Sequence, residues 1–325
     1  MSTSVHLARL AMAALAPAGV RSRLSILIYH RVRARRDPLF PAELESSGFE
    51  RHLEVVGSLF NVLPLSEAIR RLRNGTLPSR PACITFDDGY ADNAEVALPL
   101  LKRHRMTSTF FVSTGYLDGG RMWNDTVIES VRGAVGDVLD LTAMGLRPFA
   151  IASDADRRAT ISALLSQFKY LQPAERDEHC AAVREASNAA MPDDLMLSSE
   201  QVRMLHAAGM EIGAHTVTHP ILARIPIDVA RREIADGRDA LQTITGTPVT
   251  LFAYPNGKPG SDYKGEHVNA VRALGFDAAV TTSWGVARIA TDPLQLPRFT
   301  PWDGTASRIA MRFIRNLLMP PAAVS

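Results

Sequence analysis

Two adjacent carboxylates, Asp87 and Asp88, end an apolar run at residues 82–86 and are followed by Gly89. Neighbouring negative charges repel each other, and burial strengthens the repulsion, so the pair needs a compensating cation. A coordinated metal ion would neutralise one carboxylate and let the other stay ionised beside it. Gly89 allows the sharp turn that would bring both side chains to one rim.

Two histidines supply the other ligands that such a centre needs. His215 and His219 lie four positions apart in the stretch GAHTVTHP, after a strand-like run. Two imidazoles and one carboxylate form a known type of catalytic metal site that leaves a position for water. We predict that Asp88, His215 and His219 hold one divalent ion. Asp87 is then placed to take a proton from water on that ion, as general base.

The elements that must position these residues alternate between strand-like and helical runs. Strands are predicted near 24–30, 82–86, 107–113, 210–215, 248–254 and 276–282, with 294–299 as a candidate last strand. Helices are predicted near 49–60, 66–73, 91–104, 198–208, 227–244, 264–273 and 305–318. Nearly continuous apolar strands are typical of a parallel sheet covered on both faces, or of a closed barrel. Parallel strands end at one edge, so the polar residues after them are expected to meet there.

The rest of the chain is predicted to be an extension and an insertion. Residues 1–23 read as a basic amphipathic helix or extension, although 8–20 faintly resembles a secretory signal. Residues 24–325 are expected to form one barrel domain, and 121–195 a helical insertion packed on it. No run reaches the ~20 apolar residues of a membrane-spanning helix. A cytoplasmic or membrane-peripheral location is favoured over secretion.

The charge composition limits the kinds of binding partner that are expected. Thirty-six Lys and Arg against 34 Asp and Glu give a net charge of +2, which is too even to make nucleic acid the main partner. The ends are basic, since no acid precedes Asp37 and only arginines carry charge after Asp303. These ends are either simply solvated or contact an anionic membrane or glycan. The oligomeric state stays open.

At this point a resemblance adds to the residue chemistry. TFDDGY (85–90) and HTVTHP (215–220) resemble the first two motifs of the polysaccharide deacetylases, the NodB-homology family or carbohydrate esterase family four. The resemblance covers about residues 80 to 300. It implies a distorted (β/α) barrel, a divalent metal, usually zinc, and removal of N-acetyl groups from amino-sugar polymers. By position it makes Asp87 the base, and Asp88, His215 and His219 the ligands.

The third family motif is matched only in part, by FAYPNG at 252–257. Pro255 and Gly257 fit, but Ala253 stands at or near the place of the arginine that normally braces the base. One of the N-terminal arginines is a candidate replacement. The resemblance implies that the backbone N–H of Asn256 stabilises the oxyanion.

The family's C-terminal Leu-x-His motif, which supplies the general acid, is missing, since no histidine follows His267. LIYHRV near the N-terminus resembles the opening strand of a permuted branch that acts on poly-N-acetylglucosamine. That resemblance implies His30 as the acid; a core or capping role is the alternative. The other histidines of the barrel region and the insertion are predicted to lie at the surface: His52, His104, His179, His206 and His267.

Aromatic and polar residues near the motifs are candidate substrate contacts. Trp123, followed by Asn124 and Asp125, suits stacking on a sugar or anchoring the insertion, and Tyr90 is expected to line the cleft. We therefore predict a metal-dependent hydrolase that removes N-acetyl groups from an amino-sugar glycan or glycan precursor. The alternatives are the same fold acting on a small non-sugar amide, and a glycan-binding protein without turnover.

Overall fold

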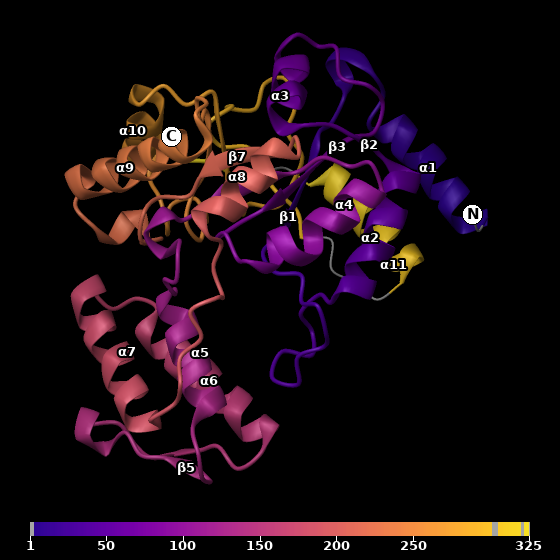
Figure 1. Cartoon of the computed structure of the whole chain (residues 1–325). Coiled ribbons are helices and arrows are strands. Elements are labelled where there is room, and N and C mark those ends of the chain that lie inside the picture. The colour runs from indigo at the N-terminus through magenta and orange to yellow at the C-terminus, as the bar shows by residue number, and fades with distance from the viewer. Residues whose placement is uncertain (1–2, 301–304, 320–321, 325) are drawn as a thin grey trace.

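A parallel sheet forms the centre of the computed structural model, which describes residues 3–300, 305–319 and 322–324 (Figure 1). Its strands run in the order β1 (Ser25–Tyr29), β3 (Pro81–Phe86), β4 (Thr109–Val112), β7 (Glu211–Ala214), β8 (Leu251–Ala253) and β9 (Ala278–Val280). The short strand β2 (Asn61–Val62) adds to β3, and every pairing in this sheet is parallel. The first six predicted strands are confirmed, five with shorter bounds and β3 with one more residue, Pro81.

The predicted last strand, 294–299, forms single bridges instead of a ladder. Leu296 pairs with Val280 of β9, and Phe299 pairs with Leu27 of β1. The N–H of Leu296 donates to the carbonyl of Ala279 at 2.8 Å, and the segment thus touches both edges of the sheet. Pro297 has no N–H to donate, so a continuous strand cannot form here. The sheet thereby curls into the expected distorted barrel.

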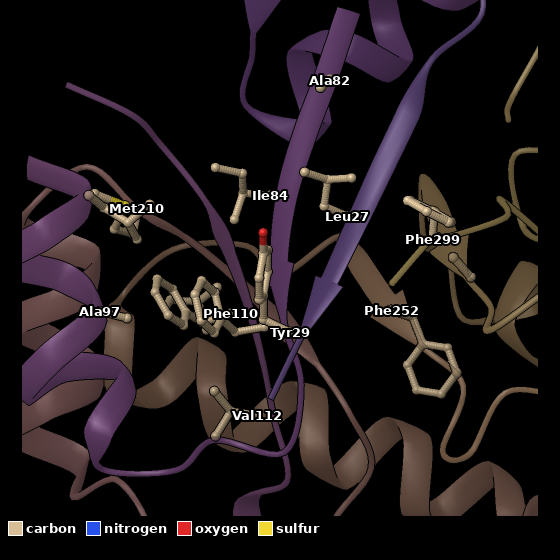
Figure 2. Close-up of a cluster of buried hydrophobic side chains, with 14 of the residues drawn as sticks. Leu27, Tyr29, Ala82, Ile84, Ala97, Phe110, Val112, Met210, Phe252 and Phe299 are labelled. Atoms are coloured by element: carbon tan, nitrogen blue, oxygen red, sulfur yellow. The ribbon is translucent and has the colours of Figure 1, made fainter. Parts of the chain in front are cut away.

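Both faces of the sheet are buried, which explains why its strands are apolar throughout. The outer face packs against helices on the outside of the barrel, and Figure 2 shows part of this core, including Leu27, Tyr29, Ile84, Phe110 and Phe252. The covering helices are α2 (Ser46–Leu59), α4 (Leu98–Arg103), α8 (Ser199–Ala207), α9 (Ile227–Thr245), α10 (Gly265–Ala273) and α11 (Ala306–Leu318). The predicted helix 91–104 is divided into a π-helical turn, η2 (Asn93–Ala97), and α4.

The inner face holds a second apolar cluster that includes Ile26, Cys83, Phe111, Ala253 and Val280. Residues of α3 (Leu65–Arg73) pack into the same cluster, so this helix closes one end of the barrel. The inner space is tight: a Cβ at position 213 would lie 2.4 Å from the Phe111 ring, so only glycine fits there. Because α3 closes one end of the barrel and the middle is filled, only the other end, where Asp87 follows β3, is left for a cavity.

The insertion forms a lobe beside the barrel with its own core (Figure 1). It contains α5 (Trp123–Gly133), β5 (Val138–Leu139), β6 (Phe149–Ala150), α6 (Asp154–Phe168) and α7 (Pro173–Ser187). Ser153 and Asp156 make a capping box at the start of α6, which satisfies two backbone donors of its first turn. The division into an extension, a barrel domain and an insertion stays a prediction.

The N-terminal helix α1 (Thr3–Leu15) packs against α11 near the other end of the chain. Ala8 and Met12 are buried, while Leu7 and Leu10 are exposed. Within the described residues, every helix is too short or too polar to cross a lipid bilayer.

Candidate active site

The chain turns sharply where β3 ends, and this turn positions both carboxylates. Asp87 continues the alternation of Cys83 and Thr85, which places its side chain on the inner face of the barrel. Asp88 has a φ of 77° and Gly89 a φ of 88°, so the left-handed turn begins one residue before the expected glycine. A left-handed aspartate is uncommon, and it aims the second carboxylate toward β7 instead of away from it.

Asp88 and the two histidines converge as a three-donor set. Asp88 Oδ1 lies 3.5 Å from His215 Nε2 and 3.5 Å from His219 Nε2. One ligand atom from each residue lies within 4.8 Å of the others. Ligands at ~2.0–2.2 Å from a tetrahedral ion are about 3.4 Å apart. The donor types and their separations therefore fit one small divalent cation.

Each imidazole is held in the orientation that ligation requires. His215 Nδ1 donates to the Ala253 carbonyl at 2.7 Å, which leaves the lone pair of Nε2 facing Asp88. Position 219 is a left-handed turn with a φ of 53°, and its N–H donates to Thr216 Oγ1. Burial lowers the pKa of His219 to about 4, so this ring is neutral at pH 7, as a metal ligand must be.

Asp87 faces a buried guanidinium that sequence reasoning missed. Arg298 donates from Nη1 and Nη2 to the two oxygens of Asp87, at 2.6 and 2.5 Å. The same side chain donates to the Thr281 carbonyl and to Thr85 Oγ1, and it is fully buried. Burial alone would raise the pKa of Asp87, but Arg298 and His215 outweigh burial and lower the pKa below its usual value. Asp87 is therefore an ionised, fixed carboxylate.

The expectation that an N-terminal arginine braces the base is wrong. Arg31 pairs instead with Asp92 at 2.7 Å, and Arg33 with Glu43 at 2.6 Å. Arg298 lies in LPRF, in the segment that closes the barrel, and it follows Leu296 on the inner face. The one sequence feature that could have identified Arg298 was its charge within an apolar, strand-like run.

One cavity of about 390 Å³ joins seven of the ten predicted site residues, and its volume is within the usual range of ligand pockets. Its wall includes His30, Asp87, Asp88, Trp123, Asn124, His215, His219 and Asn256, together with residues of α6 and α7. The strand ends supply the catalytic side of the cavity, and the insertion supplies the opposite side. Segments more than a hundred positions apart in the chain thus meet at one site.

Tyr90 and Asp125, which were expected to contact substrate, lie behind this wall. Both are buried, and the Tyr90 hydroxyl donates to Asp125 Oδ2 at 3.1 Å. Arg31 covers the Tyr90 ring at 4.4 Å from its centroid. Burial raises the pKa of Asp125 to about 7. The pair supports Asn124, whose side-chain amide lies 3.5 Å from the tyrosine oxygen and which does line the cavity.

Asn256 and His30 line the cavity and are the candidates for hydrogen bonding to substrate there. Asn256 has a φ of 57°, and its backbone N–H has no acceptor in the part of the chain that the structure describes. Pro255 is buried beneath it and does not line the cavity. The His30 imidazole also lines the cavity, while its carbonyl accepts a hydrogen bond from Asn93. Their assigned roles stay predictions.

Two of the histidines that were expected at the surface are buried, so that prediction is wrong for His52 and His267. His52 lies on the inner side of α2 and is 5% exposed. His267 accepts from the Lys264 N–H and donates to the Leu222 carbonyl, each at 3.0 Å, so it holds a helix start in place. Both are structural residues.

The chain is similar in sequence and in fold to known proteins. Residues 74–279 match the family model described as polysaccharide deacetylase. The chain belongs to the polysaccharide deacetylase family. This family consists of hydrolases, and the resemblance that the two sequence motifs carry is confirmed.

Individual relatives of this deacetylase are distant. YxkH of Bacillus subtilis (strain 168), a predicted polysaccharide deacetylase, is 22% identical over 268 residues, which are 82% of this chain and 67% of that protein. The deacetylase PplD of Streptococcus pyogenes, solved in complex with acetate, superposes with a TM-score of 0.60 at 21% identity, covering 90% of this chain and 98% of PplD. IcaB from Ammonifex degensii gives 0.59 at 19%, covering 91% and 97%. These two structures show the shared fold.

Proposed function

We propose that this deacetylase uses one divalent metal ion, zinc, to hydrolyse N-acetyl groups of an amino-sugar glycan. The observation that carries the proposal is a single cavity in which a three-donor cation site adjoins an ionised carboxylate held by Arg298. Water would add to the acetyl carbon, the carbon–nitrogen bond would break, and acetate and a free amine would leave. Acetate is also the molecule bound to the structurally similar PplD.

The residues at the cation site suit zinc. Two imidazole nitrogens and one carboxylate oxygen are the donors of known catalytic zinc sites. Asp88, His215 and His219 would hold the ion. A cation bound there would polarise the acetyl carbonyl and make water a stronger nucleophile.

Asp87 is the proposed general base. Its carboxylate lines the cavity, and His215 Nε2 lies 4.0 Å away, which is too far for a shared hydrogen bond. Arg298 occupies both carboxylate oxygens from the inner side and so fixes the direction in which Asp87 can accept a proton. The glycan-binding alternative rests on two absences, the arginine that braces this base and the C-terminal histidine, and Arg298 supplies the brace.

Three further groups have proposed roles around the acetyl group and the sugar. The free N–H of Asn256 can donate to the oxygen that becomes negative as water adds. His30 can give a proton to the departing amine nitrogen. The half-buried Trp123 offers an apolar face to a sugar ring. Each of these groups lines the same cavity.

Metal content and acetate release should be lost together in His215→Ala. The substitution removes one of three donors and the Ala253 hydrogen bond that orients it, and a site with two donors binds zinc far more weakly. We expect at least a ~100-fold loss of affinity. Metal analysis after dialysis, paired with acetate release from N-acetylglucosamine oligomers, measures both. His206→Ala, on the surface of α8, is the control. Unchanged zinc binding in His215→Ala would refute the site.

His30→Ala should slow turnover and leave zinc in place. Without an acid, the amine must leave unprotonated, and we expect kcat to fall about 100-fold. The signature is chemical: an activated amide with a good leaving group should be hydrolysed at nearly the parent rate. If both substrates slow equally, or if neither slows, the proton comes from another group.

The basic termini are a second part of the proposal. α1 and α11 pack together and leave Leu7, Leu10, Met311 and Leu318 exposed near several arginines. We propose a cytoplasmic or membrane-peripheral enzyme that contacts an anionic surface here. Sedimentation with anionic but not zwitterionic vesicles would support this contact; no sedimentation with either would refute it.

A further inference from the structure

Arg176 is a buried cation without an anionic partner among the described residues, and it faces the active-site cavity. It lies in the first turns of α7, is 6% exposed, and lines the cavity together with the metal donors. Its Nε is buried without a hydrogen-bond partner, and its guanidinium forms no ion pair with any residue that the structure describes. Its one ring contact is with Trp123, at 5.0 Å from the centroid.

Such a side chain differs from the other two buried arginines of the described residues, Arg80 and Arg298. Arg298 is paired with Asp87, and Arg80 donates to the Leu59 carbonyl, whereas no hydrogen bond links the Arg176 side chain to the described residues. A guanidinium that is largely withdrawn from water without a counter-ion is unfavourable. The free donors of Arg176 therefore point to an anion that is supplied from outside the chain.

A second cation lies on the same side of the cavity. Lys169, at the end of α6, lines the cavity with Arg176, and both continue into an adjoining depression that Arg224 also lines. The carboxylates on the opposite side are already engaged, Asp87 by Arg298 and Asp88 by the histidines. The insertion thus presents a positive wall to whatever sugar stands over Trp123.

We propose that the glycan is anionic: a carboxylate or phosphate group on it binds Arg176 and Lys169 while the N-acetyl group lies at Asp87 and the cation site. This inference rests on the proposed function and narrows its substrate class. A guanidinium binds two oxygens of such a group at once, which fixes the sugar in register. A neutral polymer of N-acetylhexosamine would leave Arg176 unpaired.

Three tetrasaccharides of equal length test this inference. One is neutral, made of N-acetylglucosamine; one alternates N-acetylhexosamine with hexuronic acid; and one is the neutral tetramer with a terminal phosphate. Calorimetry on the metal-free protein gives Kd, and acetate release with zinc gives kcat/KM. We expect one anionic tetramer to bind about 10- to 100-fold more tightly than the neutral one. Which of the two binds distinguishes carboxylate from phosphate.

Variants assign the preference to the positive wall. Arg176→Gln should abolish the preference for the anionic tetramer, and Arg176→Lys should keep part of it. Lys169→Gln, at a half-buried position, should weaken the preference, and it provides the test if Arg176→Gln does not fold. Arg203→Gln, an exposed arginine of α8, should leave it intact. Equal binding of all three tetramers, or an equal loss for all three in Arg176→Gln, would overturn the inference and leave Arg176 as a support for Trp123. Failure of the proposed function looks different: no tetramer releases acetate, whatever its Kd.

Discussion

Asp87→Asn should keep its zinc and lose its turnover. Asp87 is outside the three-donor set, so the ligands stay in place, whereas an amide cannot accept the proton from water. We expect kcat to fall by about 100- to 10,000-fold with little change in KM. Metal analysis and acetate release on one preparation make the comparison. This separation distinguishes the base from the ligands, since His215→Ala loses both properties together.

The control for this experiment is Asp177→Asn. Asp177 lies next to Arg176 on the exposed side of α7, so the variant removes a nearby carboxylate without touching the cation site. Its turnover should stay at the parent level. If Asp87→Asn retained both zinc and full turnover, the base would have to be another residue. If it lost zinc, Asp87 would be a ligand.

Arg298→Met should destabilise the whole barrel as well as the reaction. It leaves the Asp87 carboxylate buried without its partner and removes two further hydrogen bonds, to Thr281 and Thr85. Breaking a buried pair from one side costs about 3–5 kcal/mol. We expect the free energy of unfolding to fall by that amount at pH 8. The double variant Arg298→Met/Asp87→Asn should recover part of the stability and none of the turnover.

The loss should depend on pH with a definite sign. In the native protein the pKa of Asp87 is lowered, so its pairing contributes stability above the unfolded pKa of about 4, and that stability is lost as pH falls through the folded pKa. The difference between Arg298→Met and the parent should therefore be largest near neutral pH and shrink toward pH 4. Urea unfolding at several pH values measures it, with Arg203→Met as the surface control. A difference that is constant with pH would mean that lost packing, and not the charge pair, is responsible.

The centre of the site could be predicted because its chemistry is local in the sequence. Asp87 and Asp88 directly follow one strand, His215 follows another, and parallel strands must end at one edge. The strands could be predicted from their apolar runs, because both faces of the sheet are buried. These inferences needed only residue types and the alternation of elements.

What could not be predicted depends on contacts across the barrel. Arg298 is 211 positions from Asp87, and residue types alone do not show that the segment 294–299 returns to lie beside β1. Tyr90 is the last residue of the TFDDGY motif, yet Asp125 and Arg31 hold it behind the cavity wall. His52 could have been placed inside from its spacing, because it shares a helix face with Phe49, Leu53 and Val56. Treating every histidine outside a motif as exposed ignored that periodicity.

The segment 294–299, which closes the barrel, is synthesised long after the strand that precedes Asp87. Translation makes Asp87 first and its guanidinium partner 211 residues later, on the segment that closes the barrel. A nascent chain therefore carries an unbalanced carboxylate until Arg298 has emerged from the ribosome. We expect the enzyme to become active in one late folding step, because the segment that closes the barrel also brings Arg298 to Asp87.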